Sequence, residues 1–300
     1  MSELKDEIRR VLDLRDPPQD WLERIYLRES HRRRNRRVLA GVAGMGLTLV
    51  LVVALMAGLQ TRDQTRPGGK VTTPACGSGT TVAPTGWWRG DGSPVNAAGG
   101  ADAVLHGGVA FGPGIVGEAF VLDGTSGWLE VPDAAFDVGA RDFTVAMWVR
   151  FRSTVGEQVF AEDWIQGGPP GSEGWTLTKL RNDAIRFDLG AAGGVDTDQL
   201  DLPVGTWIHV AARRDAGTIA ILVNGELEAS GSMAEPLAST DSPASLNFGH
   251  RGTSEDTPGS LDDRDFFVRG ELDEIEFFVG DALTDAQILD IFGTQASCAV

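Results

Sequence analysis

An uncharged apolar stretch from Val38 to Leu59 constrains the fold of this 300-residue chain more than any other feature. Its 22 residues read VLAGVAGMGLTLVLVVALMAGL. At a rise of about 1.5 Å per residue, roughly 20 such residues span the hydrocarbon core of a bilayer. A buried helix of a soluble domain would keep a polar face, and a cleavable signal peptide would lie closer to the N-terminus. We therefore predict one transmembrane helix over residues 38–60.

The charges on either side of this stretch predict its orientation. Five arginines directly precede it, at positions 32, 33, 34, 36 and 37, whereas Arg62, Arg66 and Lys70 are spread out behind it. Basic residues are retained on the cytoplasmic side of a membrane. Residues 1–37 are therefore expected in the cytoplasm, and the C-terminal part is expected outside it. Apolar residues at helical spacing predict that the cytoplasmic segment is helical.

The part of the chain that follows the apolar stretch is strongly acidic. From Arg62 onward, 15 Lys and Arg residues face 35 Asp and Glu residues, a formal charge of −20. A nucleic-acid-binding surface needs clustered cations, so we exclude such a partner for this part. Residues 61–85 are rich in Thr, Pro, Gly and Ser, a composition typical of a flexible stalk. We expect a folded domain over residues 86–300.

The chain has two cysteines, which excludes a metal site built from several cysteines. Cys76 lies in the predicted stalk, and Cys298 lies near the C-terminus. Both are expected outside the cytoplasm, where thiols oxidise. A bond between them would close a long loop and contribute roughly 4–5 kcal/mol in the chain-entropy description. The alternatives are two unpaired thiols or a bond between two molecules.

Short strand-like runs, separated by turn residues, recur from Gly86 onward. The clearest runs are Glu118–Asp123, 127–131, Phe143–Phe151, 158–162, 175–180, 185–189, 206–213, Thr218–Val223, 245–249 and 270–279. Asn224-Gly225 is a strong hairpin signal. Thr284 and Gln287 are spaced as a capping box for a C-terminal helix. We therefore predict an all-β fold, a two-sheet antiparallel jelly-roll sandwich, preceded by a helical N-terminal segment and the transmembrane helix.

Six sequence blocks of the sandwich region carry a resemblance. In order they read GWWRGDG, VGEAFVLDGTSGWLEVP, DFTVAMWVRF, VGTWIHVAARRD, ILVNGEL and GELDEIEFF, the last followed by LTDAQI. The series is similar to the laminin-G-like, concanavalin A-like jelly-roll domain of many exported bacterial proteins, and it covers about residues 86–296. The resemblance implies ligand binding by a concave face or by rim loops, frequent Ca²⁺, and a role without catalysis.

Asp273 is the most informative polar residue of these blocks. It shares strand alternation with Ile275 and Phe277, so it is expected to face the core with them. A buried carboxylate must be paired, hydrogen-bonded or bound to a metal. The resemblance implies that an acid at this place helps to hold a structural Ca²⁺, for which Asp91 and Asp123 are the candidate partners. The alternative is that Asp273 accepts hydrogen bonds from backbone N–H groups.

The segment Glu271–Glu276 supports a competing interpretation. It resembles the Glu-x-Asp-x-(x)-Glu motif of laminarinase-type and lichenase-type glycosidases, in which one Glu is the nucleophile and another the acid. Two features argue against catalysis. The motif lies within thirty residues of the C-terminus, where few strands remain to complete a cleft, and Glu274 stands at a position that is usually apolar.

Two tryptophans are candidates for ligand binding. Trp164 and Trp175 lie on either side of a glycine-rich turn. Aromatic faces pack on sugar rings as they do on other apolar surfaces, so the pair is expected to form a platform for a sugar.

These observations predict a single-pass cell-membrane protein with a cytoplasmic N-terminus and an extracytoplasmic binding domain. We expect a non-catalytic adhesion or recognition module whose partner is a glycan or a surface protein. An alternative is a transmembrane sensor that couples binding outside to a cytoplasmic regulator. Residues 17–25, with the arginines and the apolar stretch behind them, are similar to the membrane-proximal tails of bacterial anti-sigma factors. A laminarinase-like glycoside hydrolase remains a further alternative.

Overall fold

The computed structural model describes residues 76–132, 136–168, 171–233, 244–251 and 266–299. The predicted cytoplasmic segment, the transmembrane helix and the stalk as far as residue 75 lie outside the described residues. Within the described ranges, no helix is long and apolar enough to cross a membrane. All of these ranges belong to one compact unit, Thr73–Val300.

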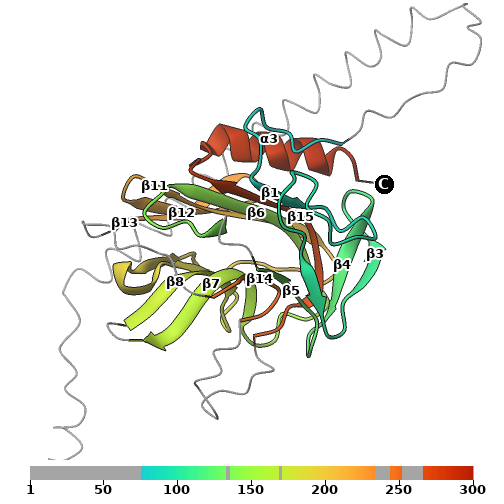
Figure 1. Ribbon diagram of the computed structural model, residues 1–300, viewed down its shortest axis with the longest axis horizontal. Coiled ribbons are helices and arrows are strands. Elements are labelled where there is room, and N and C mark those ends of the chain that lie inside the picture. Colours follow the sequence, from blue (N-terminus) through green and yellow to red (C-terminus); the bar gives the residue numbers. More distant parts are fainter. Residues whose placement is uncertain (1–75, 133–135, 169–170, 234–243, 252–265, 300) are drawn as a thin grey trace, which may run out of the picture. The chain divides into compact units, whose positions relative to one another are not determined.

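Two antiparallel sheets form the domain (Figure 1). Sheet A has the order β13 (Glu226–Ser232), β12 (Thr218–Val223), β11 (Trp207–Asp215), β6 (Phe143–Phe151), β15 (Arg269–Val279), β4 (Glu118–Asp123) and β3 (Ala110–Pro113), and β1 (Gly86–Trp88) also pairs with β15. Sheet B has the order β10 (Gly194–Asp196), β9 (Ile185–Asp188), β8 (Gly171–Lys179), β7 (Gln158–Gly168), β14 (Leu246–Phe248), β5 (Trp128–Val131) and β2 (Val104–His106). The predicted two-sheet sandwich is confirmed.

Large aromatic side chains fill the space between the sheets. Phe143 of β6 and Phe277 of β15 meet Trp175 of β8 there. The rings of Trp175 and Phe277 stack with their centroids 5.6 Å apart, and those of Phe143 and Trp175 lie 5.1 Å apart. Because aromatic side chains bury a large apolar area, this cluster contributes strongly to the hydrophobic free energy that holds the two sheets together.

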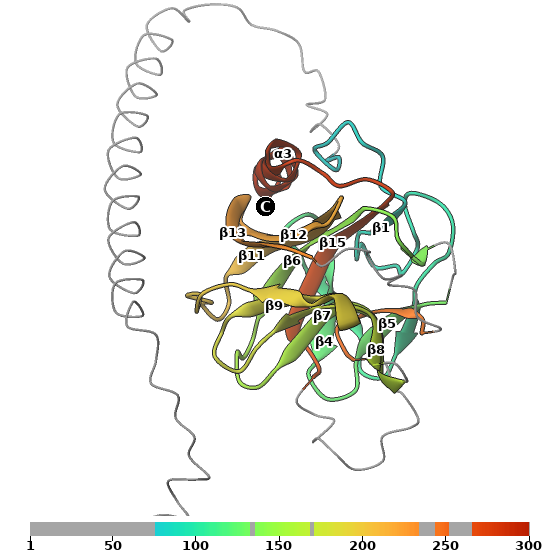
Figure 2. The same ribbon diagram turned by 90° about the vertical axis from the view of Figure 1, so that its left-hand side faces the viewer.

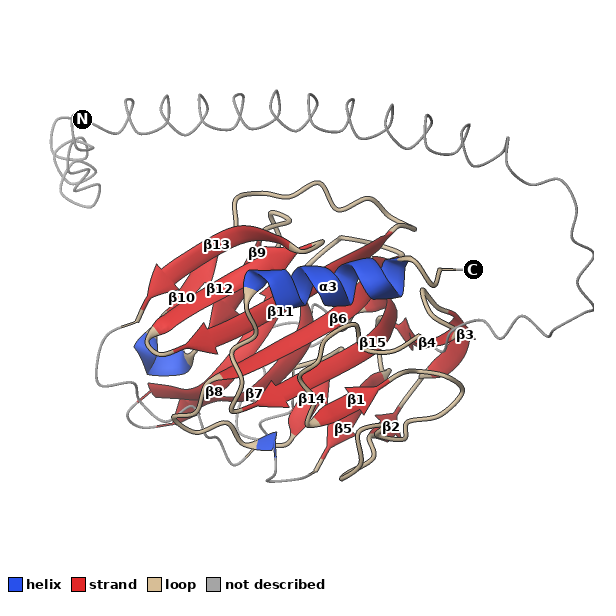
Figure 3. Ribbon diagram, turned by 90° about the horizontal axis from the view of Figure 1, so that it is seen from above, coloured by secondary structure: helices blue, strands red, loops and turns tan. Residues whose placement is uncertain are grey.

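The helix α3 (Asp285–Ala296) covers the outer face of sheet A, as the side view and the view from above show (Figures 2 and 3). It begins at the predicted capping box, in which Thr284 and Gln287 exchange hydrogen bonds. Its buried Ile288 and Ile291 pack on small and apolar residues of the sheet. These residues include Ala146, Ala211, Ala220, Leu222 and Phe278. The small side chains let the helix approach the sheet closely.

The folded domain begins earlier than the sequence predicts. Residues 76–85, assigned above to the stalk, pack on sheet A next to α3. Ser78 donates a hydrogen bond to Glu276 of β15 over 2.9 Å, and Val82 contacts the apolar cluster beneath the helix. The backbone N–H of Thr85 donates to the carbonyl of Phe277 over 2.8 Å. The folded part therefore starts no later than Cys76.

Most of the predicted elements appear in the structure with small shifts at their ends. The hairpin at Asn224-Gly225 joins β12 to β13, and both residues have positive φ, 52° and 77°. The strands that we did not predict are β1, β2, β3 and β10, each of three or four residues. Length alone does not explain why they were missed, because β5, β9 and β14 are as short and were predicted.

Candidate functional site

A bulge in β15 changes the face on which its acidic residues lie. The pairing with β6 shifts between Asp273 and Glu276, and Glu274 adopts a positive φ of 47°. Leu272 and Ile275 both reach the core. The predicted alternation of Asp273 with Ile275 and Phe277 is therefore wrong, because the extra residue in the bulge reverses it. Asp273 lies on the outer face of sheet A, opposite Trp148.

Asp273 is nevertheless fully buried, because the loop between β3 and β4 covers it. Its Oδ2 accepts hydrogen bonds from the backbone N–H groups of Ile115 and Val116, over 2.7 and 3.1 Å. Its Oδ1 accepts from the N–H of Glu274 over 2.8 Å. Burial raises the pKa of Asp273 to about 8 against the lowering effect of the hydrogen bonds. The interpretation of Asp273 as an acceptor for backbone N–H groups is confirmed.

The neighbouring acids of β15 are also buried and bonded to the protein. Glu271 binds Arg150 and Arg152 at 3.0 and 2.5 Å. Glu274 accepts from Trp87 Nε1 over 2.6 Å and contacts Arg89 Nε at 3.3 Å. Burial raises the pKa of Glu274 to about 7.

Glu276 lies below α3 and the segment that leads into β1. Its oxygens accept from Ser78 Oγ over 2.9 Å and from Gln295 Nε2 over 3.0 Å, and burial raises the pKa of Glu276 to about 8. Gln295 in turn accepts from Trp148 Nε1 over 2.7 Å. The three carboxylates of the glycosidase-like motif are those of Glu271, Asp273 and Glu276. They share one face of sheet A, but each is buried and bonded to protein groups.

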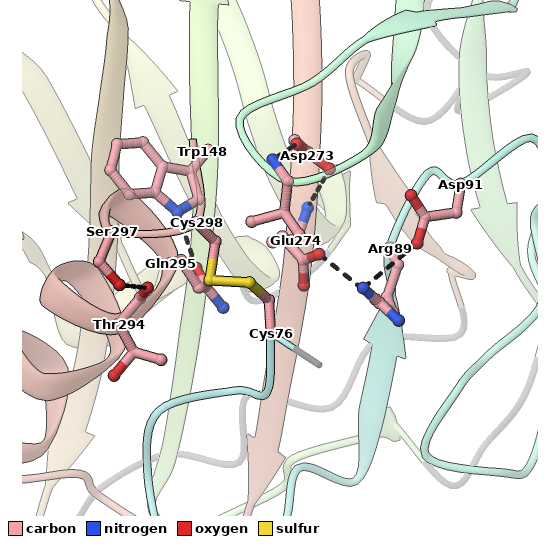
Figure 4. The surroundings of a disulfide bond; sticks show 11 residues. Cys76, Arg89, Asp91, Trp148, Asp273, Glu274, Thr294, Gln295, Ser297 and Cys298 are labelled. Atoms are coloured by element: carbon pink, nitrogen blue, oxygen red, sulfur yellow. Dashed lines mark hydrogen bonds and ion pairs between the residues drawn. A yellow bond between two sulfur atoms is a disulfide. The ribbon is translucent and has the colours of Figure 1, made fainter. Parts of the chain in front are cut away.

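The predicted disulfide between Cys76 and Cys298 is confirmed, and the two Cα atoms lie 6.2 Å apart. Figure 4 shows it with Trp148 on one side and the Asp273–Glu274 pair on the other. The bond links the segment before β1 to the end of α3. It therefore closes the cover over the buried acids of β15.

The three predicted calcium ligands do not fit a calcium site. Asp91 accepts from the N–H of Glu118 over 3.0 Å and pairs with Arg89 at 3.3 Å. Asp123, at the far end of β4, accepts from Ser126 Oγ and from backbone N–H groups of the following turn. Calcium needs six to eight oxygen ligands, whereas these carboxylates face donors of hydrogen bonds. Among the described residues, no three His, Cys, Asp or Glu side chains are grouped to hold a metal.

The predicted sugar platform of Trp164 and Trp175 is wrong. Trp175 lies in the core between the sheets and is fully buried. In the ladder between β7 and β8, Trp175 stands opposite Asp163, whereas Trp164 stands opposite Gly174. Successive residues of a strand point to opposite faces, so the half-buried Trp164 lies on the outer face of sheet B and cannot act with Trp175.

The outer face of sheet B carries a different group of polar and aromatic side chains, which we call the sheet-B patch. It consists of His106, Trp128, Glu130, Ser245 and Asn247. Leu129 and Leu246 point into the core, so their strand neighbours face outward. The described helix α3 lies on the opposite side of the sandwich (Figure 1).

Hydrogen bonds fix the geometry of the sheet-B patch. Glu130 accepts from Ser245 Oγ over 2.8 Å, and its other oxygen lies 2.8 Å from His106 Nε2. The side chains of His106 and Glu130 are about a third exposed, at 35% and 27%. Asn247 donates to the carbonyl of Ser245 over 2.9 Å, while its buried Oδ1 has no hydrogen-bond partner among the described residues.

An aromatic ladder runs from the sheet-B patch into the protein. His106 stacks on Trp128 with the ring centroids 4.0 Å apart and the planes 9° from parallel. His250 follows at 6.1 Å from Trp128, and it stacks on Phe267 at 3.7 Å. Burial lowers the pKa of His250 to about 4, so this ring is neutral at neutral pH. The ladder presents two partly exposed rings, His106 and Trp128, beside the Glu130 carboxylate.

Sequence reasoning missed the sheet-B patch. The signal was the alternation in Gly-Trp-Leu-Glu-Val, which places Trp128 and Glu130 on one face and Leu129 on the other. His106 and Asn247 come from strands of three residues, and nothing in the sequence shows that they lie next to β5.

Several solved structures share this fold. Domain 4 of AbnA, an extracellular arabinanase from Geobacillus stearothermophilus in complex with arabinotriose, matches with a TM-score of 0.53 and 20% identity, over 69% of this chain and 97% of that chain. A structure of botulinum neurotoxin type C, a toxin whose cell entry depends on interaction with two ganglioside molecules, matches with a TM-score of 0.53 and 15% identity. The match covers 71% of this chain and 51% of that chain. The binding domain of botulinum neurotoxin DC in complex with rat synaptotagmin II matches with a TM-score of 0.54 and 15% identity. The match covers 71% of this chain and 52% of that chain.

The match covers about half the length of the two toxin chains, and at these identities the likeness shows the fold alone. No protein among the curated sequences matches this chain. Residues 123–289, more than half of the chain, match the family described as Laminin_G_3. This chain therefore belongs to the concanavalin A-like lectin/glucanases superfamily.

Proposed function

We propose that this chain is a membrane-anchored protein whose extracytoplasmic sandwich domain binds a glycan at the sheet-B patch, without catalysing a reaction. The observation that carries the proposal is the His106–Trp128 stack beside Glu130 and Asn247. Sugars are bound by an aromatic face that packs on the apolar side of the ring and by oxygen acceptors for the hydroxyl groups. The patch offers both on a face that α3 does not cover.

The known structures of this fold support a binding role. The arabinanase domain was solved with arabinotriose, and the toxin work concerns gangliosides. The acids of β15 support the absence of catalysis, because Glu271, Asp273 and Glu276 are all buried and held by protein groups. A glycosidase needs one carboxyl to reach the leaving oxygen and another to reach the sugar carbon.

Binding is tested by titrating residues 73–300 with arabinotriose and with a panel of neutral oligosaccharides in a calorimeter. Replacing Trp128→Ala removes the ring on which His106 stacks, and we expect it to weaken binding at least about tenfold, as loss of a buried aromatic contact does. Trp207→Ala is the matched control, because Trp207 is a half-buried tryptophan on sheet A. An equal loss of affinity in the two variants, or no loss of affinity in Trp128→Ala, would contradict the assignment of the site.

The location of the domain is tested separately on intact cells. The apolar stretch 38–60 and the arginines before it support an N-terminus in the cytoplasm and a C-terminal domain outside. Protease added to intact cells should then remove the domain. Protection of the domain in intact cells, with cleavage only after lysis, would contradict the proposed orientation.

A further inference from the structure

Five neighbouring strands of sheet B place one polar residue each in a line across its outer face. The register pairs Glu130 of β5 with Asn247 of β14, Asn247 with Glu162 of β7, Glu162 with Thr176 of β8, and Thr176 with Asp188 of β9. We call this line the acidic row. Side chains that lie directly opposite each other on neighbouring strands have Cβ atoms about 5 Å apart. Three carboxylates therefore stand along the line that passes through the sheet-B patch.

The two arginines beside the acidic row are already paired. Arg251 Nε lies 3.4 Å from Glu162, and its guanidinium carbon lies 4.3 Å from the centre of the Phe266 ring. Arg186 holds Asp196 with two hydrogen bonds, over 2.7 and 2.8 Å. Proteins recognise carboxylate and sulfate groups with arginine forks or lysines. These two forks are occupied by carboxylates of the protein itself.

Only the two ends of the row are open to a ligand, because the Glu130 side chain is 27% exposed and Asp188 is half-buried, whereas Asn247, Glu162 and Thr176 are buried. At the exposed end the Glu130 carboxylate only accepts hydrogen bonds, and the buried Asn247 beside it directs its amide donor to the carbonyl of Ser245, away from a ligand. The hydroxyl groups of a sugar supply the matching donors. Ser245 and His106 hold the Glu130 carboxylate in place. An anionic group on the ligand would meet acceptors and negative charge.

We infer that the sheet-B patch selects uncharged glycans and rejects glycans that carry sialic acid or another carboxylate. The inference rests on the proposed function and decides between the two ligand classes found with this fold, the neutral arabinotriose and the gangliosides. The formal charge of −20 over residues 62–300 acts in the same direction at longer range. Salt screens such repulsion within about 8 Å at physiological ionic strength.

The test uses the full chain, purified in detergent, on an array that carries neutral glycans together with the same glycans capped by sialic acid. We expect the bound spots to be neutral glycans, with at least about tenfold more signal than their sialylated partners. Equal or stronger binding of the sialylated partners would overturn the inference and leave the proposed function intact. Binding to no glycan on the array would overturn the proposed function and the inference with it.

A charge variant shows whether the acidic row causes the selection. Glu130→Gln keeps the shape of the side chain and removes its charge, so we expect the ratio of neutral to sialylated binding to fall about threefold. Glu118→Gln is the matched control, because Glu118 is an exposed glutamate of β4 in sheet A, and its ratio should stay that of the parent. Raising the salt concentration should lower the ratio of the parent. If the ratio of neutral to sialylated binding stays the same in Glu130→Gln and at raised salt, the acidic row does not cause the selection.

Discussion

Glu274 shows how one residue organises a whole face of the protein. Its φ of 47° lies in the left-handed region, which costs about 1–2 kcal/mol for a residue with a side chain. The bonds from its carboxylate to Trp87 and Arg89 hold it there. Because the bulge at Glu274 shifts the register, Asp273 and Glu276 come to lie on the same outer face of sheet A. There they bind the β3–β4 loop and the cover formed by α3 and the segment 76–79.

Replacing Asp273→Ala tests the stabilising role of this carboxylate. The substitution leaves the N–H groups of Ile115, Val116 and Glu274 buried without their acceptor. Each unsatisfied buried group costs about 1–3 kcal/mol. Part of this cost is offset because the variant no longer buries a carboxyl group. We therefore expect the free energy of unfolding to fall by about 2–4 kcal/mol. Urea unfolding measures the change. Asp290→Ala, an exposed aspartate of α3, is the control and should change it by less than about 0.5 kcal/mol; a similar small change at Asp273 would contradict the role.

Among the elements, strands of six or more residues and the C-terminal helix could be predicted, because their alternation and caps are local. The cystine was predicted as well, since the expected compartment and the count of two cysteines leave few alternatives. The bulge at Glu274 was not predictable, because no turn residue marks it. Trp175 was assigned to a surface because a strand's pattern does not say which of its two faces meets the other sheet. The sheet-B patch needs the order of the strands, which the sequence does not state.

The disulfide and α3 form one structural element with the segment before β1. Replacing both Cys76 and Cys298 by Ser should lower the free energy of unfolding by about 2–5 kcal/mol, because the open chain gains conformational freedom. We expect hydrogen exchange to increase first in α3 and to stay slow in the strands of sheet B. The reduced parent should behave as the variant does. Uniformly faster exchange throughout the domain would show that the bond stabilises more than the cover.

On the scale of the whole molecule, two sets of buried groups respond to pH in opposite directions. Burial raises the pKa of Asp273 and Glu276 to about 8 and that of Glu274 to about 7, so the folded state holds these protons more tightly than the unfolded state. Their contribution to stability is full at acidic pH and is lost as the pH rises toward 8. Burial lowers the pKa of His209 to about 3 and of His250 to about 4, and their contribution is lost as the pH falls below 6.5.

Glu276→Gln separates the carboxylates from the histidines, because both histidines are the same in parent and variant. The amide resembles the protonated acid and keeps an oxygen for one of the donors Ser78 and Gln295. The parent loses the contribution of Glu276 between pH 4.5 and about 8, whereas the variant has nothing to ionise there. We expect equal melting temperatures near pH 4.5 and a variant that is more stable at pH 8 by at least about 1.4 kcal/mol, the equivalent of one pKa unit. In a domain of this size that difference raises the melting temperature by about 3–6 °C. Calorimetric scans at several pH values measure it, with the exposed Glu118→Gln as the control. Parallel melting curves for parent and Glu276→Gln from pH 4.5 to 8 would show that Glu276 is ionised throughout, and that the cover over β15 holds a charge instead of a proton.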